Sequence, residues 1–138
     1  EVHAGDLDGL ILPGGFGAAK NLSDFAVKGP EATVHPEVQR LLEEMAEAGK
    51  PIGAICIAPA TLTRALSTRH PEVTIGTDAA TGSAIEAMGG THRICTVDQI
   101  HVDETNRLVT TPAYMLAGGP AEVFAGARRM VEELDRLF

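Results

Sequence analysis

The chain has 138 residues, of which 44% are hydrophobic and 4% aromatic, and its formal net charge is −8 at pH 7. This length suits one hydrophobic core and is short for two, so we expect a single domain over residues 1–138. The acidic balance argues against nucleic acid and anionic membrane as partners, because both select a basic face.

An apolar run over residues 8–12 ends in a proline followed by Gly14 and Gly15. A continuous apolar run that stops at such a turn is typical of a buried parallel strand. The glycine-rich turn over residues 14–17 either brings bare backbone N–H groups to a ligand or only turns the chain. It is no phosphate-binding loop, because the Gly-Lys-Ser/Thr ending is missing.

Helical spacing of apolar residues predicts a helix over residues 36–48, with Pro36 in its first turn and Gly49 just past its end. Residues 52–55 are then a second buried strand. Residues 57–66 form the next helix. Two strands joined by a helix make a right-handed crossover unit.

A further short strand is expected over residues 72–75, and a short helix over residues 81–88. Asp78 lies between them. It is either a turn or cap residue, which is the commoner role of an aspartate after a strand, or a side chain that faces the second strand's end.

Three short strands are expected over residues 93–97, 100–102 and 108–111, with a turn over 103–106 that makes the last two a hairpin. The final helix begins near Pro120. Strands and helices thus alternate before a late hairpin, with no linker or repeat. The pattern predicts an α/β fold, a doubly wound parallel sheet with helices on both faces.

The corner at Cys56 joins the second strand to its helix, and Pro59 fits the first helical turn. Such a corner lifts a nucleophile out of the sheet, and the free N–H groups of the helix start favour a negative charge there. The alternative is a small buried cysteine within a strand.

Addition of a thiolate to a carbonyl also needs donors for the oxyanion and a group that moves protons. The N–H of Ile57 and the N–H of Gly15 are the candidate donors. No histidine has a spacing that places it beside Cys56, and His92 is the first choice among the five because it opens a strand after two glycines. Cys95 is most simply a packed thiol.

The two cysteines are too few for a disulfide framework and match no zinc spacing, so we expect a reducing compartment, the cytoplasm, and no metal. No apolar run approaches the roughly 20 residues that span a bilayer. We therefore expect no membrane partner.

Four motifs together resemble one family. They are Leu-Pro-Gly-Gly-Phe-Gly-Ala-Ala-Lys-Asn-Leu over residues 12–22, Cys-Ile-Ala-Pro-Ala over 56–60, Thr-Ile-Gly-Thr-Asp over 74–78 and Val-Thr-Thr-Pro-Ala-Tyr-Met over 109–115. In this order they resemble the ElbB family of isoprenoid-biosynthesis glyoxalases. That family belongs to the PfpI-like branch of the class I glutamine amidotransferase-like superfamily.

The resemblance implies a flavodoxin-like α/β sandwich, a homodimer, and conversion of the small carbonyl glyoxal to glycolate without a cofactor. It also implies an association with isoprenoid biosynthesis. By this analogy Cys56 is the nucleophile, and Gly14, Gly15 and Ile57 surround the substrate oxyanion.

Two departures from the family pattern bear on catalysis. Relatives often place a histidine directly after the cysteine or after the next strand, where this chain has Ile57 and Gly76, so Asp78, Thr77 or His92 would have to replace it. Superfamily members also supply a glutamate from an N-terminal strand and loop, and we expect that this chain begins after that segment.

We therefore expect that the first strand-helix unit is lacking, that an apolar sheet edge near residue 10 is exposed, and that activity is impaired. The alternative function is a non-catalytic regulatory or redox-sensing module that uses Cys56. A glutamine amidotransferase is disfavoured, because the late His-x-Glu pair is replaced by Pro-Ala-Tyr at residues 112–114.

Overall fold

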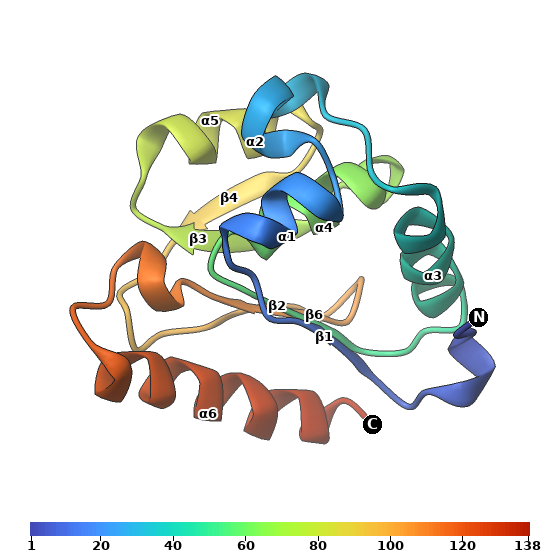
Figure 1. Ribbon diagram of the computed structural model, residues 1–138. Coiled ribbons are helices and arrows are strands. Elements are labelled where there is room, and N and C mark those ends of the chain that lie inside the picture. The colour runs from blue at the N-terminus through green and yellow to red at the C-terminus, as the bar shows by residue number, and fades with distance from the viewer.

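A four-stranded sheet and a separate two-stranded ladder form the centre of the computed structural model, which describes residues 1–138 (Figure 1). The four-stranded sheet has the order β1 (Leu10–Leu12), β2 (Ile52–Ile55), β6 (Leu108–Thr111), β5 (His101–Asp103), and the ladder pairs β3 (Glu72–Gly76) with β4 (Thr91–Ile94). The helices are α1 (Phe16–Asn21), α2 (Phe25–Lys28), α3 (Pro36–Glu47), α4 (Ala58–Ala65), α5 (Ala79–Ala87) and α6 (Pro120–Arg136).

The strands β1, β2 and β6 run parallel, so their carboxyl ends meet at one edge of the sheet. Leu12 is in register with Ala54, and Ala54 with Thr110. β5 pairs antiparallel with β6, which confirms the late hairpin. The loops after β1 and β2 therefore lie at the same end of the fold, where open α/β sheets bind ligands.

The β3 strand is joined to the main sheet by hydrogen bonds to side chains and not by a backbone ladder. The Thr74 N–H donates to Thr110 Oγ1 at 2.9 Å, and the Glu72 N–H donates to Asp103 Oδ2 at 2.9 Å. β3 thus lies beside β6 and β5 and is joined to them through side chains instead of a backbone ladder. The predicted doubly wound sheet is present, but β3 and β4 form a distinct parallel pair.

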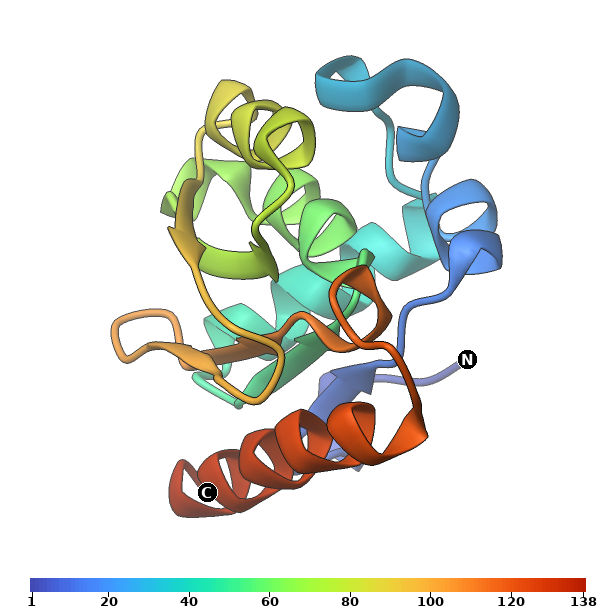
Figure 2. The same cartoon turned by 90° about the vertical axis from the view of Figure 1, so that its left-hand side faces the viewer.

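Helices cover both faces of the sheet, as predicted. Ile52 and Ala54 of β2 pack in a core with Leu42 and Leu62, on the side of α3 and α4. The α6 helix lies alone on the other face (Figure 2). It approaches closely because Gly53 has no side chain, since a Cβ there would lie 2.8 Å from Leu134 Cδ1.

The main helix ends follow their sequence signals. Pro36 opens α3, the His35 Nδ1 accepts the Glu37 N–H at 3.2 Å, and Gly49 adopts a φ of +66° past the end. α5 begins two residues before its predicted start, because Asp78 caps it. The sequence did not predict α1 and α2, which are short.

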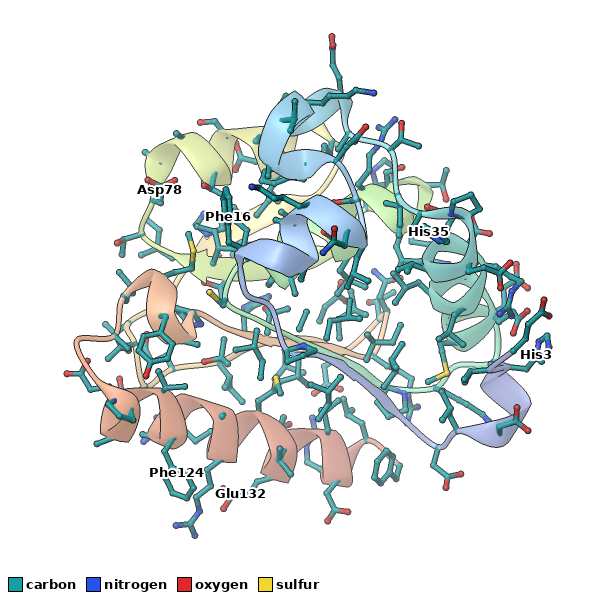
Figure 3. All side chains as sticks on the ribbon, in the orientation of Figure 1. His3, Phe16, His35, Asp78, Phe124 and Glu132 are labelled. Carbon is teal, nitrogen blue, oxygen red and sulfur yellow. The ribbon has the colours of Figure 1, made fainter.

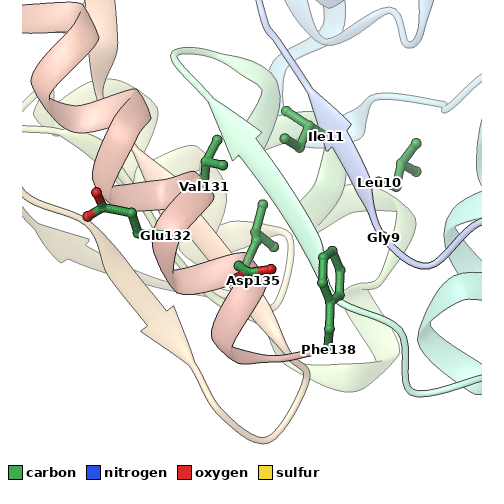
Figure 4. Close-up of a pocket in the computed structure, with 8 residues that line it drawn as sticks. Gly9, Leu10, Ile11, Val131, Glu132, Asp135 and Phe138 are labelled. Carbon is green, nitrogen blue, oxygen red and sulfur yellow. The ribbon is translucent and has the colours of Figure 1, made fainter.

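The β1 strand forms an open edge, because β2 is its only neighbour. Ile11 is 41% exposed, and a groove between β1 and α6 is lined chiefly by apolar side chains, including Leu10, Val131 and Phe138 (Figure 4). The expected exposed apolar edge near residue 10 is confirmed. None of the helices combines the length and the apolar run of a membrane span.

Candidate active site

Cys56 occupies the sharp corner between β2 and α4, as the sequence predicted. Its N–H donates to the Thr111 carbonyl oxygen at 3.0 Å, and its φ is +64°. A residue with a Cβ in this left-handed region costs about 1–2 kcal/mol. The corner therefore stores backbone strain at the residue that carries the thiol.

Buried neighbours on both sides of Cys56 hold it in this conformation. β2 is paired with β1 on one side and β6 on the other. Ala58, Pro59 and Ala60 at the start of α4 are all buried. A strained backbone persists only where its surroundings over-determine it, and this corner meets that condition.

The loop after β1 lies directly against the corner. Gly14 has a φ of +84°, and a Cβ on it would lie 2.4 Å from the Ile55 carbonyl oxygen and 3.0 Å from Cys56 Cβ. Only glycine fits at this approach. The structure thus brings the predicted residue Gly14 to the cysteine, and Gly15 is the next residue of the same loop.

Two backbone donors near the thiol have no acceptor in the chain. The Gly15 N–H and the Ile57 N–H donate no hydrogen bond, and they come from the two segments that meet at Cys56. Gly15 is also the residue before α1, with a φ of +85°. Free backbone N–H groups of this kind can stabilise an oxyanion when they point at the oxygen of a bound substrate.

An apolar cavity of about 330 Å³ opens beside the thiol. Every lining residue is hydrophobic: Phe16, Ala19, Phe25, Ala26, Cys56, Ile57 and Met115. The Phe16 ring is 68% exposed, and the Lys20 Nζ lies 4.8 Å from its centroid. Figure 3 places Phe16 at the start of α1, on the other side of the sheet from Phe124 of α6.

Asp78 occupies the cap position that was one of its two expected roles. Its Oδ2 accepts the Thr81 hydroxyl at 2.5 Å and the Thr81 N–H at 2.9 Å. These bonds hold the pKa of the Asp78 carboxyl below its usual value. Asp78 forms no hydrogen bond with Cys56, so its proton-transfer role stays a prediction.

His92 packs between β3 and α5. Its Nε2 accepts the Ile75 N–H at 3.2 Å, and a Cβ on Gly82 would lie 2.8 Å from its Nδ1. Burial lowers the pKa of His92, against a smaller upward effect of Glu86 and Asp78. A neutral ring is required for Nε2 to accept this bond. His92 likewise forms no hydrogen bond with the thiol.

The other four histidines bond elsewhere. Their partners are the Arg40 guanidinium for His3, the Glu37 N–H for His35, the Gly89 carbonyl for His70 and the Glu72 carboxylate for His101. No carboxylate forms a hydrogen bond with Cys56. The chain thus places the Gly14 loop against Cys56, and no proton carrier is hydrogen-bonded to the thiol.

Sequence reasoning missed the cavity walls. Phe16, Phe25 and Met115 are contributed by α1, α2 and the turn Ala113–Met115, which are short elements without helical periodicity to reveal them. One signal was present, since Phe16 follows the glycine turn at the carboxyl end of a predicted strand. An apolar residue there faces the ligand end of the sheet.

Comparison with known proteins supplies a family context. Residues 1–115 match the DJ-1/PfpI family. The human mitochondrial glutamine amidotransferase-like class 1 domain-containing protein 3 is 44% identical over 99% of this chain and 53% of its own length, and the rat mitochondrial ES1 protein homolog is 40% identical. The chain spans about half the length of these relatives.

A solved structure agrees with this context. An isoprenoid biosynthesis protein with an amidotransferase-like domain from Ehrlichia chaffeensis superposes with a TM-score of 0.89 at 31% identity, over all of this chain and 63% of that one. The predicted flavodoxin-like α/β fold of the amidotransferase-like proteins is thereby confirmed.

The comparisons correct the expected location. The human, rat and Danio rerio relatives are all named as mitochondrial proteins, so the cytoplasmic prediction is wrong. Two unpaired cysteines indicate a reducing compartment, and this property does not distinguish the cytoplasm from the interior of an organelle.

Proposed function

This chain belongs to the DJ-1/PfpI family, and on that premise we propose that it is a cofactor-independent glyoxalase-type enzyme of the ElbB kind, associated with isoprenoid biosynthesis and acting as a homodimer. The family includes enzymes of the glyoxalase and deglycase type. The observation that carries the proposal is the strained corner at Cys56, with Gly14 packed against it and unpartnered N–H groups at Gly15 and Ile57 in the two segments that meet there.

The proposed reaction uses the thiol and these backbone donors. The Cys56 sulfur adds to one aldehyde carbon of glyoxal, and the oxygen accepts hydrogen bonds from Gly15 and Ile57. Water carries a proton from this carbon to the second one, so the first is oxidised to a thioester and the second reduced to an alcohol. Hydrolysis of the thioester releases glycolate and restores the thiol.

Glycolate formation from glyoxal tests the proposal. The purified protein is compared with Cys56→Ala, which removes one sulfur from a half-buried turn and leaves the fold intact. We expect slow but steady turnover, because no proton carrier is hydrogen-bonded to the thiol, and none in the variant. Equal turnover by both proteins contradicts the proposal.

The alternative function is redox sensing, and the absence of a hydrogen-bonded base at Cys56 favours it. Oxidation of the Cys56 thiol by peroxide does not need a residue that moves a proton between two substrate carbons. Stoichiometric modification of Cys56 without any turnover would support this alternative. Sedimentation tests the homodimer separately: the mass of two chains supports it, and the mass of one contradicts it.

A further inference from the structure

We propose that the cavity beside Cys56 selects 2-oxoaldehydes that carry an aryl or large alkyl group on the ketone carbon, in preference to glyoxal. This inference rests on the proposed function and names its substrate class. Its basis is the chemistry of the cavity walls.

The cavity wall offers no charged side chain and no hydrogen-bonding side chain other than the thiol. Two aromatic rings, Phe16 and Phe25, form part of it. Its volume of about 330 Å³ is that of a small-molecule site. Glyoxal has only hydrogen beyond its two carbonyl groups, so it leaves this apolar surface in contact with water.

The proposed oxyanion donors are backbone groups, whereas the cavity walls are apolar side chains, so the two ends of a substrate would meet different partners. The oxyanion donors belong to the backbone at Gly15 and Ile57, whereas Phe16, Phe25 and Met115 contribute side chains to the cavity. With the aldehyde carbon on sulfur and its oxygen at the donors, the substituent of the ketone carbon is left to fill the cavity.

The chemistry balances for this class of substrate. The thiol of Cys56 adds across the aldehyde of R–CO–CHO and forms a C–S bond and a hydroxyl. The hydrogen on that carbon leaves as a proton and another proton returns to the ketone carbon, which yields the thioester of R–CH(OH)–COOH. Water cleaves the C–S bond and releases the 2-hydroxy acid. No external oxidant or reductant takes part.

The expected preference follows from burial of apolar area. Each methylene equivalent that the cavity removes from water raises kcat/KM about fourfold. The value of kcat/KM should therefore be higher for phenylglyoxal than for methylglyoxal, and higher for methylglyoxal than for glyoxal. We expect phenylglyoxal to exceed glyoxal at least tenfold.

Phe16 and Phe124 give a matched pair of variants, since both rings are exposed, at 68% and 67%, and only Phe16 lines the cavity. Phe16→Ala should reduce the preference for phenylglyoxal over glyoxal several-fold, and Phe16→Leu should retain most of it. Phe124→Ala should leave it unchanged. Equal kcat/KM for the two substrates, or equal effects of Phe16→Ala and Phe124→Ala, overturns the inference.

A second measurement separates this inference from the proposed function. The alkylation rate of Cys56 is compared for N-benzyl iodoacetamide and iodoacetamide, which needs no turnover. A benzyl preference that Phe16→Ala removes supports the apolar site even if no 2-hydroxy acid is ever formed. Turnover of glyoxal without any benzyl or phenyl preference supports the function and overturns the inference.

Discussion

The corner between β3 and α5 places Gly76 at a φ of +104°, whereas the corner between β2 and α4 places Cys56 at +64°. Both corners join a parallel strand to a helix. At the first, glycine adopts the positive φ without strain and Asp78 caps the helix. At the second, a residue with a side chain holds the positive φ.

The helix starts differ in the same way. Asp78 accepts the Thr81 N–H, but Ile57, at the start of α4, has no side chain that accepts a hydrogen bond. A capped corner satisfies its backbone donors, and an uncapped corner keeps them for a ligand. The β2–α4 corner thus forgoes local stability and keeps a thiol and free donors at the end of the sheet.

The largest expected effect is a loss of folding stability from a substitution at the β3–α5 corner. In Gly76→Ala the new Cβ meets a positive φ and lies 2.9 Å from Leu116 Cγ. We expect a loss of about 2 kcal/mol or more in the free energy of unfolding, measured by urea denaturation. Gly5→Ala is the control, because nothing lies within 4 Å of its Cβ. Equal stability of the two variants would contradict the steric account.

A smaller effect of opposite sign is expected at the other corner. Glycine adopts a positive φ without the strain that alanine retains. The Cys56→Gly variant should therefore have a free energy of unfolding about 1 kcal/mol higher than the Cys56→Ala variant. At Cys95, which is buried and has no positive φ, the order should reverse. A glycine variant at residue 56 less stable than the alanine variant would show that the corner is unstrained.

The cap at Asp78 should contribute less. Because its pKa is lowered in the folded state, its stabilisation is present above the ordinary carboxyl pKa and is lost as pH falls through the lowered value. The melting temperature of Asp78→Ala should thus be lower than that of the unmodified protein at neutral pH, and the two temperatures should converge in acid. Asp78→Asn keeps an acceptor and should retain most of the stability at neutral pH.

The smallest effect concerns His92. Its pKa is lowered by burial, so its contribution is present above the ordinary histidine pKa of about 6.5 and is lost as pH falls through the lowered value. His92→Gln keeps an acceptor for the Ile75 N–H without titrating. Between pH 7 and pH 5 the melting temperature of this variant should depend less on pH than that of the unmodified protein. An unchanged pH dependence would mean that His92 is not the group responsible.

Local patterns predicted most of the fold. Continuous apolar runs located β1 and β2, and Pro36 with Gly49 located both ends of α3. These signals lie in neighbouring residues. The separation of β3 from the sheet was not predictable, because the Thr110 hydroxyl that replaces the ladder bond comes from 36 residues away.

The candidate site was predicted only in its backbone part. The glycine turn and the Cys56 corner carry short sequence signals, and the structure brings them together through Gly14. The cavity depends on the tertiary placement of Phe25 and Met115, which no spacing encodes. The proton carrier was sought by residue type, but His92 and Asp78 are bonded within the fold instead.

The central claim is that the strained corner presents a reactive thiol, and the alkylation rates of the two cysteines test it most directly. Cys56 is half-buried at the cavity, whereas Cys95 is 7% exposed. The folded protein is treated with iodoacetamide near neutral pH, and each cysteine peptide is quantified by mass spectrometry over time. We predict that Cys56 reacts at least about tenfold faster than Cys95. Equal rates, or faster labelling of Cys95, would contradict the account.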